Sequence, residues 1–157
     1  MILKINITEF RERLNKNTKY GNPKIKGTPF GAFYIFGESN KIFFGTYDKN
    51  KFELTKNFIT QITPYIISGE IQSKNNIQTE VNYEIKPIGF GYYWMKYLLL
   101  IMIPMFNLIL YTQSAPFEIF KIANLGLFPM GIFNYFYMRR KKNKLENDFK
   151  NFFEIEI

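Results

Sequence analysis

The feature that most constrains this chain is an apolar stretch from Tyr92 to Met138. It divides into two segments, residues 92–111 and 117–138, which are separated by the short polar run TQSAP. Each segment has about the 20 residues that a helix needs to cross the hydrocarbon core of a bilayer. Because the connection is so short, the two helices must run antiparallel. The sequence therefore predicts a two-helix transmembrane hairpin over residues 92–138.

Aromatic side chains support this interpretation because they mark the expected membrane interfaces. Tyr92 and Trp94 lie at one end of the first segment, and Tyr135 and Tyr137 lie at the end of the second. The alternative is a buried helical hairpin of a soluble protein. No other segment of the chain is apolar enough to cover two such helices on all sides, which favours the membrane.

Basic residues follow the second segment directly and set the predicted orientation. The turn between the segments contains no Lys or Arg. Basic flanks of transmembrane segments stay in the cytoplasm. We therefore expect a multi-pass protein of the inner (cytoplasmic) membrane, with both termini cytoplasmic and only the turn near Ser114 outside. The residues expected to set this topology and to contact anionic lipid are Arg139, Arg140, Lys141, Lys142 and Lys144.

Polar residues inside the two segments fall at matching depths if the turn centres near Ala115. Asn107 then lies opposite Asn124, and Lys96 lies opposite Asn134. Each of these side chains needs a partner in lipid. The candidate contact residues, either across the hairpin or to a partner, are Lys96, Asn107, Asn124, Gly131 and Asn134.

Three roles for this polar stripe remain open. It can hold the hairpin together through a hydrogen bond between Asn107 and Asn124, dock another membrane subunit, or line a path for ions. Conduction is the least favoured, since two helices cannot enclose a pore without oligomerising. Gly126 and Gly131 are predicted to let the two backbones approach. Lys96 lies near the cytoplasmic end, where its side chain can reach the headgroup region.

Residues 1–91 precede the hairpin and predict a small cytoplasmic α+β domain. A short strand opens the chain, and a helix follows it to about Asn17, with Thr8 as its N-cap. Residues 19–28 are rich in Gly and Pro and indicate a loop. Period-two alternation then predicts an antiparallel β-meander whose buried face is covered by the helix. Its strands are predicted at residues 31–37, 41–47, 51–56, 64–72 and 78–86.

Residues 139–157 predict a basic juxtamembrane helix that continues the second segment into the cytoplasm. The apolar residues on one face of this helix are Leu145, Phe149, Phe152 and Phe153. We expect this face either to pack on the sheet or to lie in the headgroup region. Only the short run 86–91 joins the last strand to the hairpin, so the sheet is expected close beneath the bilayer.

The residue types that carry most catalysis are missing. The sequence contains no histidine and no cysteine, the commonest general base and the thiol nucleophile. It has no phosphate-binding glycine loop, no nucleophile elbow and no metal-ligand spacing. A carboxylate pair of Glu70 with Glu80 or Glu84 could do acid–base chemistry, but charges that keep an exposed face in water are the simpler interpretation. We therefore expect no catalytic residues, no cofactor and no metal.

The formal net charge is +8. Part of it is the basic cluster that follows the hairpin, and the rest is spread over residues 1–91 without a recognisable nucleic-acid-binding module. Membrane lipid, rather than nucleic acid, is therefore the expected anionic partner.

A series of spaced landmarks lies between residues 44 and 87. They are Phe44-Gly45, Phe52, Leu54, Pro64, Gly69-Glu70-Ile71, Thr79, Val81 and Pro87. The chain also begins with a strand and helix of the form ILKINITEFRERL. This arrangement resembles an uncharacterised family of small bacterial membrane proteins with a β-rich cytoplasmic domain followed by two transmembrane helices. The resemblance implies that architecture and no particular activity.

These patterns predict a non-catalytic inner-membrane protein. Its expected role is an accessory or assembly subunit of a larger membrane complex, or a membrane-tethered binding module, in contact with a membrane-protein partner or a second copy of itself. The alternative is a small oligomerising membrane-acting effector, such as a toxin or defence protein, in which Lys96, Asn107 and Asn124 line subunit contacts. An enzyme that uses carboxylates on the exposed sheet is the third class.

Overall fold

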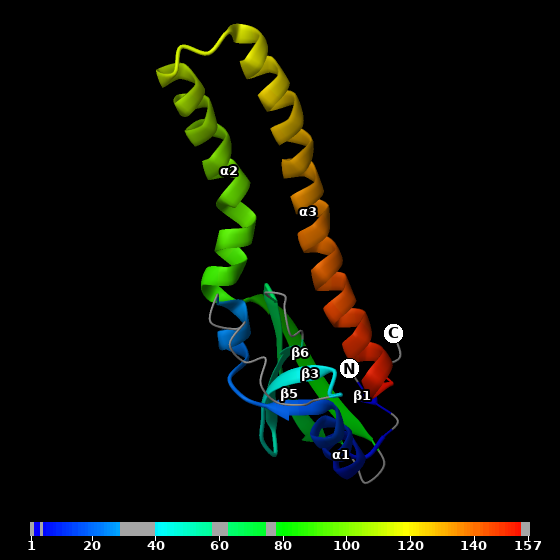
Figure 1. Cartoon of the computed structure of the whole chain (residues 1–157). Coiled ribbons are helices and arrows are strands. Elements are labelled where there is room, and N and C mark those ends of the chain that lie inside the picture. The colour runs from blue at the N-terminus through cyan, green and yellow to red at the C-terminus, as the bar shows by residue number, and fades with distance from the viewer. Residues whose placement is uncertain (1, 4, 29–39, 58–62, 75–77, 155–157) are drawn as a thin grey trace.

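A computed structural model describes residues 2–3, 5–28, 40–57, 63–74 and 78–154. Within these residues the chain forms a six-stranded sheet and three α-helices, two of which project from the sheet as a long hairpin (Figure 1). The predicted α+β class is confirmed. The first and last described elements both lie at the sheet, so the hairpin turn is the part of the chain furthest from them (Figure 1).

The helix α1 (Ile7–Asn17) follows the two-residue strand β1 (Ile2–Leu3) and ends where the sequence predicts. Its N-cap is Asn6, whose side-chain oxygen accepts a hydrogen bond of 2.8 Å from the amide of Glu9. The prediction of Thr8 as N-cap is wrong. Asparagine is the stronger N-cap of the two residue types, and the helix begins two residues earlier than it would with Thr8 as its cap.

The segment predicted as a loop contains two elements. The strand β2 (Thr18–Tyr20) pairs in parallel with β3 (Phe43–Tyr47). The short 3-10 helix η1 (Pro23–Gly27) is capped by the side chain of Asn22 and has proline in its first turn. The sheet is therefore mixed rather than purely antiparallel. Three strand residues are too few to show a period-two pattern, which is why the sequence did not reveal β2.

The other strands form the predicted antiparallel meander. In chain order they are β3, β4 (Lys51–Lys56), β5 (Tyr65–Ser73) and β6 (Thr79–Pro87). The order across the sheet is β1-β6-β5-β4-β3-β2. These elements confirm four of the five strands predicted for the meander. The remaining one, at residues 31–37, lies outside the described residues.

One face of the sheet is covered by α1 together with the last turns of α3 (Phe117–Phe153). The ring of Phe149 stacks on that of Phe52 with 5.4 Å between centroids, and Phe10 of α1 lies 4.7 Å from Phe153. The end of α3 thus packs on the sheet, which was one of its two predicted positions. The buried residues of this core include Leu3, Phe10, Leu14, Phe43, Phe52, Leu54, Ile67, Ile71, Val81, Leu145, Phe149 and Phe153.

The helix α2 (Gly89–Thr112) starts almost directly after β6 and is held against η1. The amide of Ile88 donates to the carbonyl oxygen of Pro64 at 2.8 Å. A Cβ atom on Gly91 would lie only 2.0 Å from the carbonyl oxygen of Gly27, so this close approach requires glycine. The hairpin is therefore attached to the sheet at both of its ends, through η1 by α2 and through the core by α3.

Length and composition identify α2 as the one helix among the described residues that could cross a membrane. Its most apolar window has a mean hydropathy of 1.6, and none of that window is buried. The second predicted segment forms the first part of α3, where Lys121, Asn124 and Asn134 lower the hydropathy. By this criterion there is one candidate span rather than the two that the sequence analysis predicts.

The two glycines Gly91 and Gly126 give a matched test of how α2 is attached. We expect Gly91→Ala to destabilise the protein by about 1–3 kcal/mol, because its Cβ would displace the backbone of Gly27. Gly126→Ala on α3 should leave stability nearly unchanged, because nothing lies within 4 Å of its Cβ position. Unfolding in detergent micelles, followed by the fluorescence of Trp94, the single tryptophan, measures both. Equal effects of the two variants would contradict the attachment.

Candidate functional site

The helices α2 and α3 are joined by side-chain amides in the half of the hairpin nearer the turn. Asn107 Nδ2 donates to Asn124 Oδ1 at 2.9 Å, and Asn124 Nδ2 donates to Asn107 Oδ1 at 2.7 Å. Each amide also donates to the carbonyl oxygen four residues earlier in its own helix, that of Ile103 or Phe120, at 2.8 Å. Both N–H donors of each amide are thus used within the chain.

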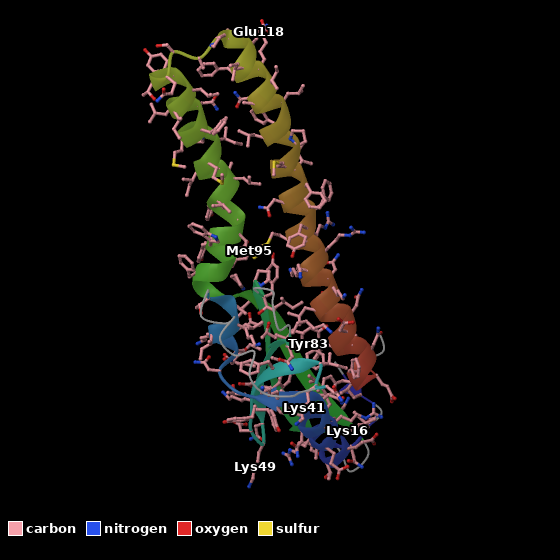
Figure 2. The ribbon with its side chains drawn as sticks, in the orientation of Figure 1. Lys16, Lys41, Lys49, Tyr83, Met95 and Glu118 are labelled. Atoms are coloured by element: carbon pink, nitrogen blue, oxygen red, sulfur yellow. The ribbon has the colours of Figure 1, made fainter. Side chains whose placement is uncertain are left out.

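A second contact lies nearer the sheet. Asn134 Nδ2 donates to the main-chain oxygen of Met95 at 2.7 Å, and Figure 2 shows Met95 on the lower part of α2. Lys96, the next residue, directs its ammonium group to aromatic rings, 5.6 Å from the centroid of Tyr92 and 5.0 Å from that of Tyr97. The structure therefore places Asn134 beside Met95 at the level of Lys96, and the charge of Lys96 is accommodated by tyrosine rings.

The predicted role of glycine in this hairpin is wrong. A Cβ atom placed on Gly126 or on Gly131 would have no neighbour within 4 Å. The reason is that the helices contact each other through the extended side chains of Asn107, Asn124 and Asn134, which keep the two backbones apart. Gly131 is therefore not a close-approach position, although the sequence placed it on the contact stripe.

The outer surface of the hairpin is apolar and exposed. Leu100 of α2 is 63% exposed, and Ile122 and Leu125 of α3 are 70% and 76% exposed. Further large exposed residues are Ile101, Met105, Phe106, Leu108, Ile109, Phe117, Phe128, Met130, Ile132, Phe133, Tyr135 and Phe136. Apolar patches of this extent mark contact with lipid or with another protein, since soluble monomers rarely expose more than a few hundred Å² contiguously.

The basic residues predicted to set topology lie on α3 directly after this apolar part. Lys141 is half-buried, and its ammonium nitrogen lies 5.2 Å from the ring centroid of Tyr137. The exposed members of the group are Arg139, Arg140, Lys142 and Lys144. At the other end of the hairpin, Glu118 and Lys121 pair at 2.9 Å, and Figure 2 shows Glu118 at the end furthest from the sheet. The cationic surplus is therefore on the sheet side.

Two carboxylates on the sheet, Glu70 and Glu84, form ion pairs. Glu70 pairs with Lys51 on the neighbouring strand at 2.9 Å, and Glu84 pairs with Lys86 on its own strand. They line an open depression of about 770 Å³ on the uncovered part of the sheet. Glu80 does not line this depression. Among the described residues no group of three or more acidic side chains could hold a metal ion.

The shifted pKa values outside the hairpin have local structural causes. Burial lowers the pKa of Lys26, which is 3% exposed and lies on η1. Burial likewise raises the pKa of the Tyr83 hydroxyl on β6. Hydrogen bonds from the amides of Asn50 and Lys51 lower the pKa of Asp48 in the β3–β4 turn. These groups lie on three different elements, and each shift is explained by packing or turn geometry.

Comparison with models of protein families, with curated proteins and with solved structures finds no match for this chain. The resemblance noted in the sequence therefore stays a prediction.

The amide pair gives a double-mutant test. We expect Asn107→Leu to destabilise the hairpin, because it leaves the Asn124 amide without its partner in an apolar environment. Asn124→Leu should do the same, and the double variant should be less destabilised than the sum of the two. The expected coupling is about 0.6–2 kcal/mol, measured by unfolding in mixed micelles of rising SDS content.

The matched control for that cycle is Asn107→Leu combined with Ile122→Ala, since Ile122 lies on the outer surface. These two changes should add. Additive behaviour of the Asn107–Asn124 cycle itself would show that the amides do not stabilise each other.

Proposed function

We propose that the α2–α3 hairpin spans the inner membrane, with both ends of the chain cytoplasmic, and holds the sheet against the cytoplasmic face. In this proposal the protein is non-catalytic and serves as an accessory or assembly subunit of a larger membrane complex, or as a membrane-tethered binding module. The observation that carries it is the arrangement of the hairpin, which turns its amides inward to one another and its large apolar side chains outward.

The length of α2 fits this proposal. Its 24 residues extend over roughly 36 Å at 1.5 Å per residue, against about 30 Å for the hydrocarbon core. Its interior contains Pro104, and its one charged residue, Lys96, lies near the sheet end. The helix is therefore long enough to cross the core and to leave its charged end in the headgroup region.

The first part of α3 has a lower hydropathy, but its polar groups are partnered. Asn124 and Asn134 bond to α2, and Lys121 pairs with Glu118 next to the turn. A polar side chain that is hydrogen-bonded inside a hairpin costs much less in lipid than an unpartnered one. The mean hydropathy of α3 alone does not include the stabilisation that these hydrogen bonds provide in lipid. Paired with α2, the segment is suited to be the second span.

The orientation follows from the basic cluster that begins at Arg139. These residues lie on the sheet side of the hairpin, whereas the turn between α2 and α3 contains no Lys or Arg. Positive flanks favour the cytoplasmic side. The sheet would then face the cytoplasm, directly beneath the bilayer.

The double attachment of the hairpin supports a role in docking rather than in membrane damage. It fixes the sheet relative to the membrane and leaves the polar depression around Glu53, Ser68 and Glu70 open to the cytoplasm. The amide N–H groups of Asn107 and Asn124 donate within one chain, so these donors are not available for hydrogen bonds between the subunits of a pore. We therefore favour the accessory or binding module over the membrane-acting effector.

Membrane retention and partner content test this proposal together. Membranes that contain the full chain are washed with alkaline carbonate, extracted in mild detergent and analysed by size-exclusion chromatography with mass spectrometry. We expect retention through the wash and co-migration with a second protein at fixed stoichiometry. Release by carbonate would contradict the membrane hairpin. A homo-oligomer without any other protein would contradict the accessory role and favour the effector.

Charges introduced on the hairpin test whether its surface contacts lipid, and the same charges introduced on the sheet are the control. Leu100 and Phe128 are exposed near the middle of the two predicted spans, so Leu100→Asp/Phe128→Asp should prevent stable insertion, at about 2.5–3.5 kcal/mol for each charge near the helix centre. Gln72→Asp/Asn82→Asp adds the same charge at exposed positions on the sheet and should leave retention unchanged. Normal retention of both double variants would show that the hairpin surface does not contact lipid.

A further inference from the structure

The strand β6 has an outer edge that is paired over only part of its length. Its outer side pairs with β1 at Thr79 and Glu80. The strand continues to Pro87, and among the described residues no other strand pairs with that side. The order of the sheet therefore leaves residues 82–87 of β6 as an unpaired edge, and such an edge can accept a further strand.

The direction of the main-chain groups at this edge follows from the pairing of β6 with β5. The amide of Lys74 donates to the carbonyl oxygen of Gln78 at 3.1 Å, in the same register as the β5–β6 ladder. Because hydrogen-bonded and non-hydrogen-bonded pairs alternate in an antiparallel ladder, the even-numbered residues of β6 bond to β5. The odd-numbered residues direct their N–H and C=O groups outward. Tyr83 and Ile85 therefore each present a donor and an acceptor at the edge.

A groove of about 400 Å³ lies between this edge and α3. Residues 81–85 of β6 line one side of it, and Lys142 and Glu146 of α3 line the other. Figure 2 shows Tyr83 beside the last part of α3, where its ring lies 5.1 Å from that of Phe149 and its hydroxyl group donates to Oε1 of Glu146 at 3.4 Å. The helix thus covers the face of the sheet beside β6 and leaves the edge itself open to an added strand.

The two faces of β6 differ in polarity along this edge. Tyr83 and Ile85 lie on the α3 side, where both are half-buried and pack against the core. Asn82, Glu84 and Lys86 alternate with them on the opposite face and are exposed. A strand added here would bury Tyr83 and Ile85 further if its own residues on the α3 side were apolar. Its residues on the other face would lie beside charged and polar groups.

We propose that the edge of β6 binds an extended segment of a partner protein as an added antiparallel strand, in line with β1. The antiparallel direction continues the existing β1–β6 pairing. The bound segment has apolar residues on the α3 side and a basic residue across from Glu84, since opposite charges on neighbouring strands attract each other. Main-chain hydrogen bonds provide affinity, and the alternation provides selectivity. This inference rests on the binding role proposed above and names the kind of segment that is bound.

A second copy of the chain is a poorer fit to this edge. Two identical edges pair antiparallel about a two-fold axis that is perpendicular to the sheet. The last turns of α3 lie on the face of the sheet, so this axis would run across α3 and point the second hairpin in the opposite direction. Two copies inserted in one membrane with the same orientation cannot pair in this way. A segment of a different protein is therefore the occupant that agrees with the proposed topology.

A synthetic peptide tests the edge directly. The probe is acetyl-Val-Glu-Val-Lys-Val-Thr-amide, which places valines on the α3 side, lysine across from Glu84 and glutamate across from Lys86. It is added at millimolar concentration to the full chain in detergent micelles, and amide hydrogen exchange is followed by NMR. We expect the peptide to slow exchange severalfold at Tyr83 and Ile85, the residues whose N–H groups face outward. Unchanged exchange at these two residues would overturn the proposal.

N-methylated forms of the probe separate main-chain pairing from simple adhesion of apolar side chains. In an antiparallel addition the N–H groups of the valines face β6, and those of the intervening residues face away. Methylation of the valine amides should therefore abolish the protection, whereas methylation of the three amides between them should leave it. Equal protection by the two forms would show that the peptide does not bind as a strand. The reverse pattern would overturn the antiparallel direction.

Ile85 provides a matched pair of protein variants. Ile85→Pro removes an N–H group that faces away from β5, a position where an edge strand tolerates proline. Ile85→Val keeps the N–H group and has a side chain of similar size, so the two variants should unfold at nearly the same temperature. Peptide binding should weaken on the order of tenfold or more in the proline variant and stay nearly unchanged in the valine variant. Equal binding by the two folded variants would contradict the added strand.

The same variants distinguish this inference from the proposed function. The protein that co-migrates with the full chain after mild extraction should be lost from Ile85→Pro and kept by Ile85→Val, while both variants stay in the membrane through the carbonate wash. A partner kept by Ile85→Pro would overturn the edge as its binding site and leave the accessory role standing. A full chain that co-migrates with no other protein would contradict the accessory role, and the peptide would still report on the edge.

Discussion

The structure depends on α3 being a single helix of 37 residues with two different environments. Its first part exposes large apolar side chains, and its last turns bury Leu145, Phe149 and Phe153 in the core of the sheet. The helix is continuous through Pro129, so whatever surrounds its first part also locates the sheet. Loss of Phe149 from the core would therefore affect the position of the sheet relative to the hairpin as much as the stability of the domain.

The attachment of α2 to η1 fixes the position of the hairpin on the sheet at a second point. Gly91 packs on Gly27 at a distance that excludes any side chain, and Ile88 bonds to Pro64. The two helices thus leave the sheet from separate points and converge where Asn134 meets Met95. Near this contact Lys96 lies over the rings of Tyr92 and Tyr97 on α2, a composition suited to the layer between lipid and water.

Much of this architecture could be predicted from local patterns. Period-two alternation located β3 to β6, and equal depth about the turn placed Asn107 opposite Asn124. Features that depend on tertiary contact were missed. The parallel strand β2 is too short to show a pattern, and the need for glycine at Gly91 exists only because η1 lies against it. Lys56 of β4 pairs with Asp148 of α3 across 92 positions of sequence, and no local motif signals such a meeting.

We propose that the hairpin crosses the membrane with its turn outside and the sheet in the cytoplasm. The chain has no cysteine, so single cysteines introduced at Ser114 in the turn and at Asn151 near the end of α3 can be labelled without ambiguity. A membrane-impermeant maleimide applied to intact spheroplasts should label Ser114→Cys, and should label Asn151→Cys only after permeabilisation. Protection of Ser114→Cys in intact spheroplasts, or labelling of Asn151→Cys there, would contradict the account.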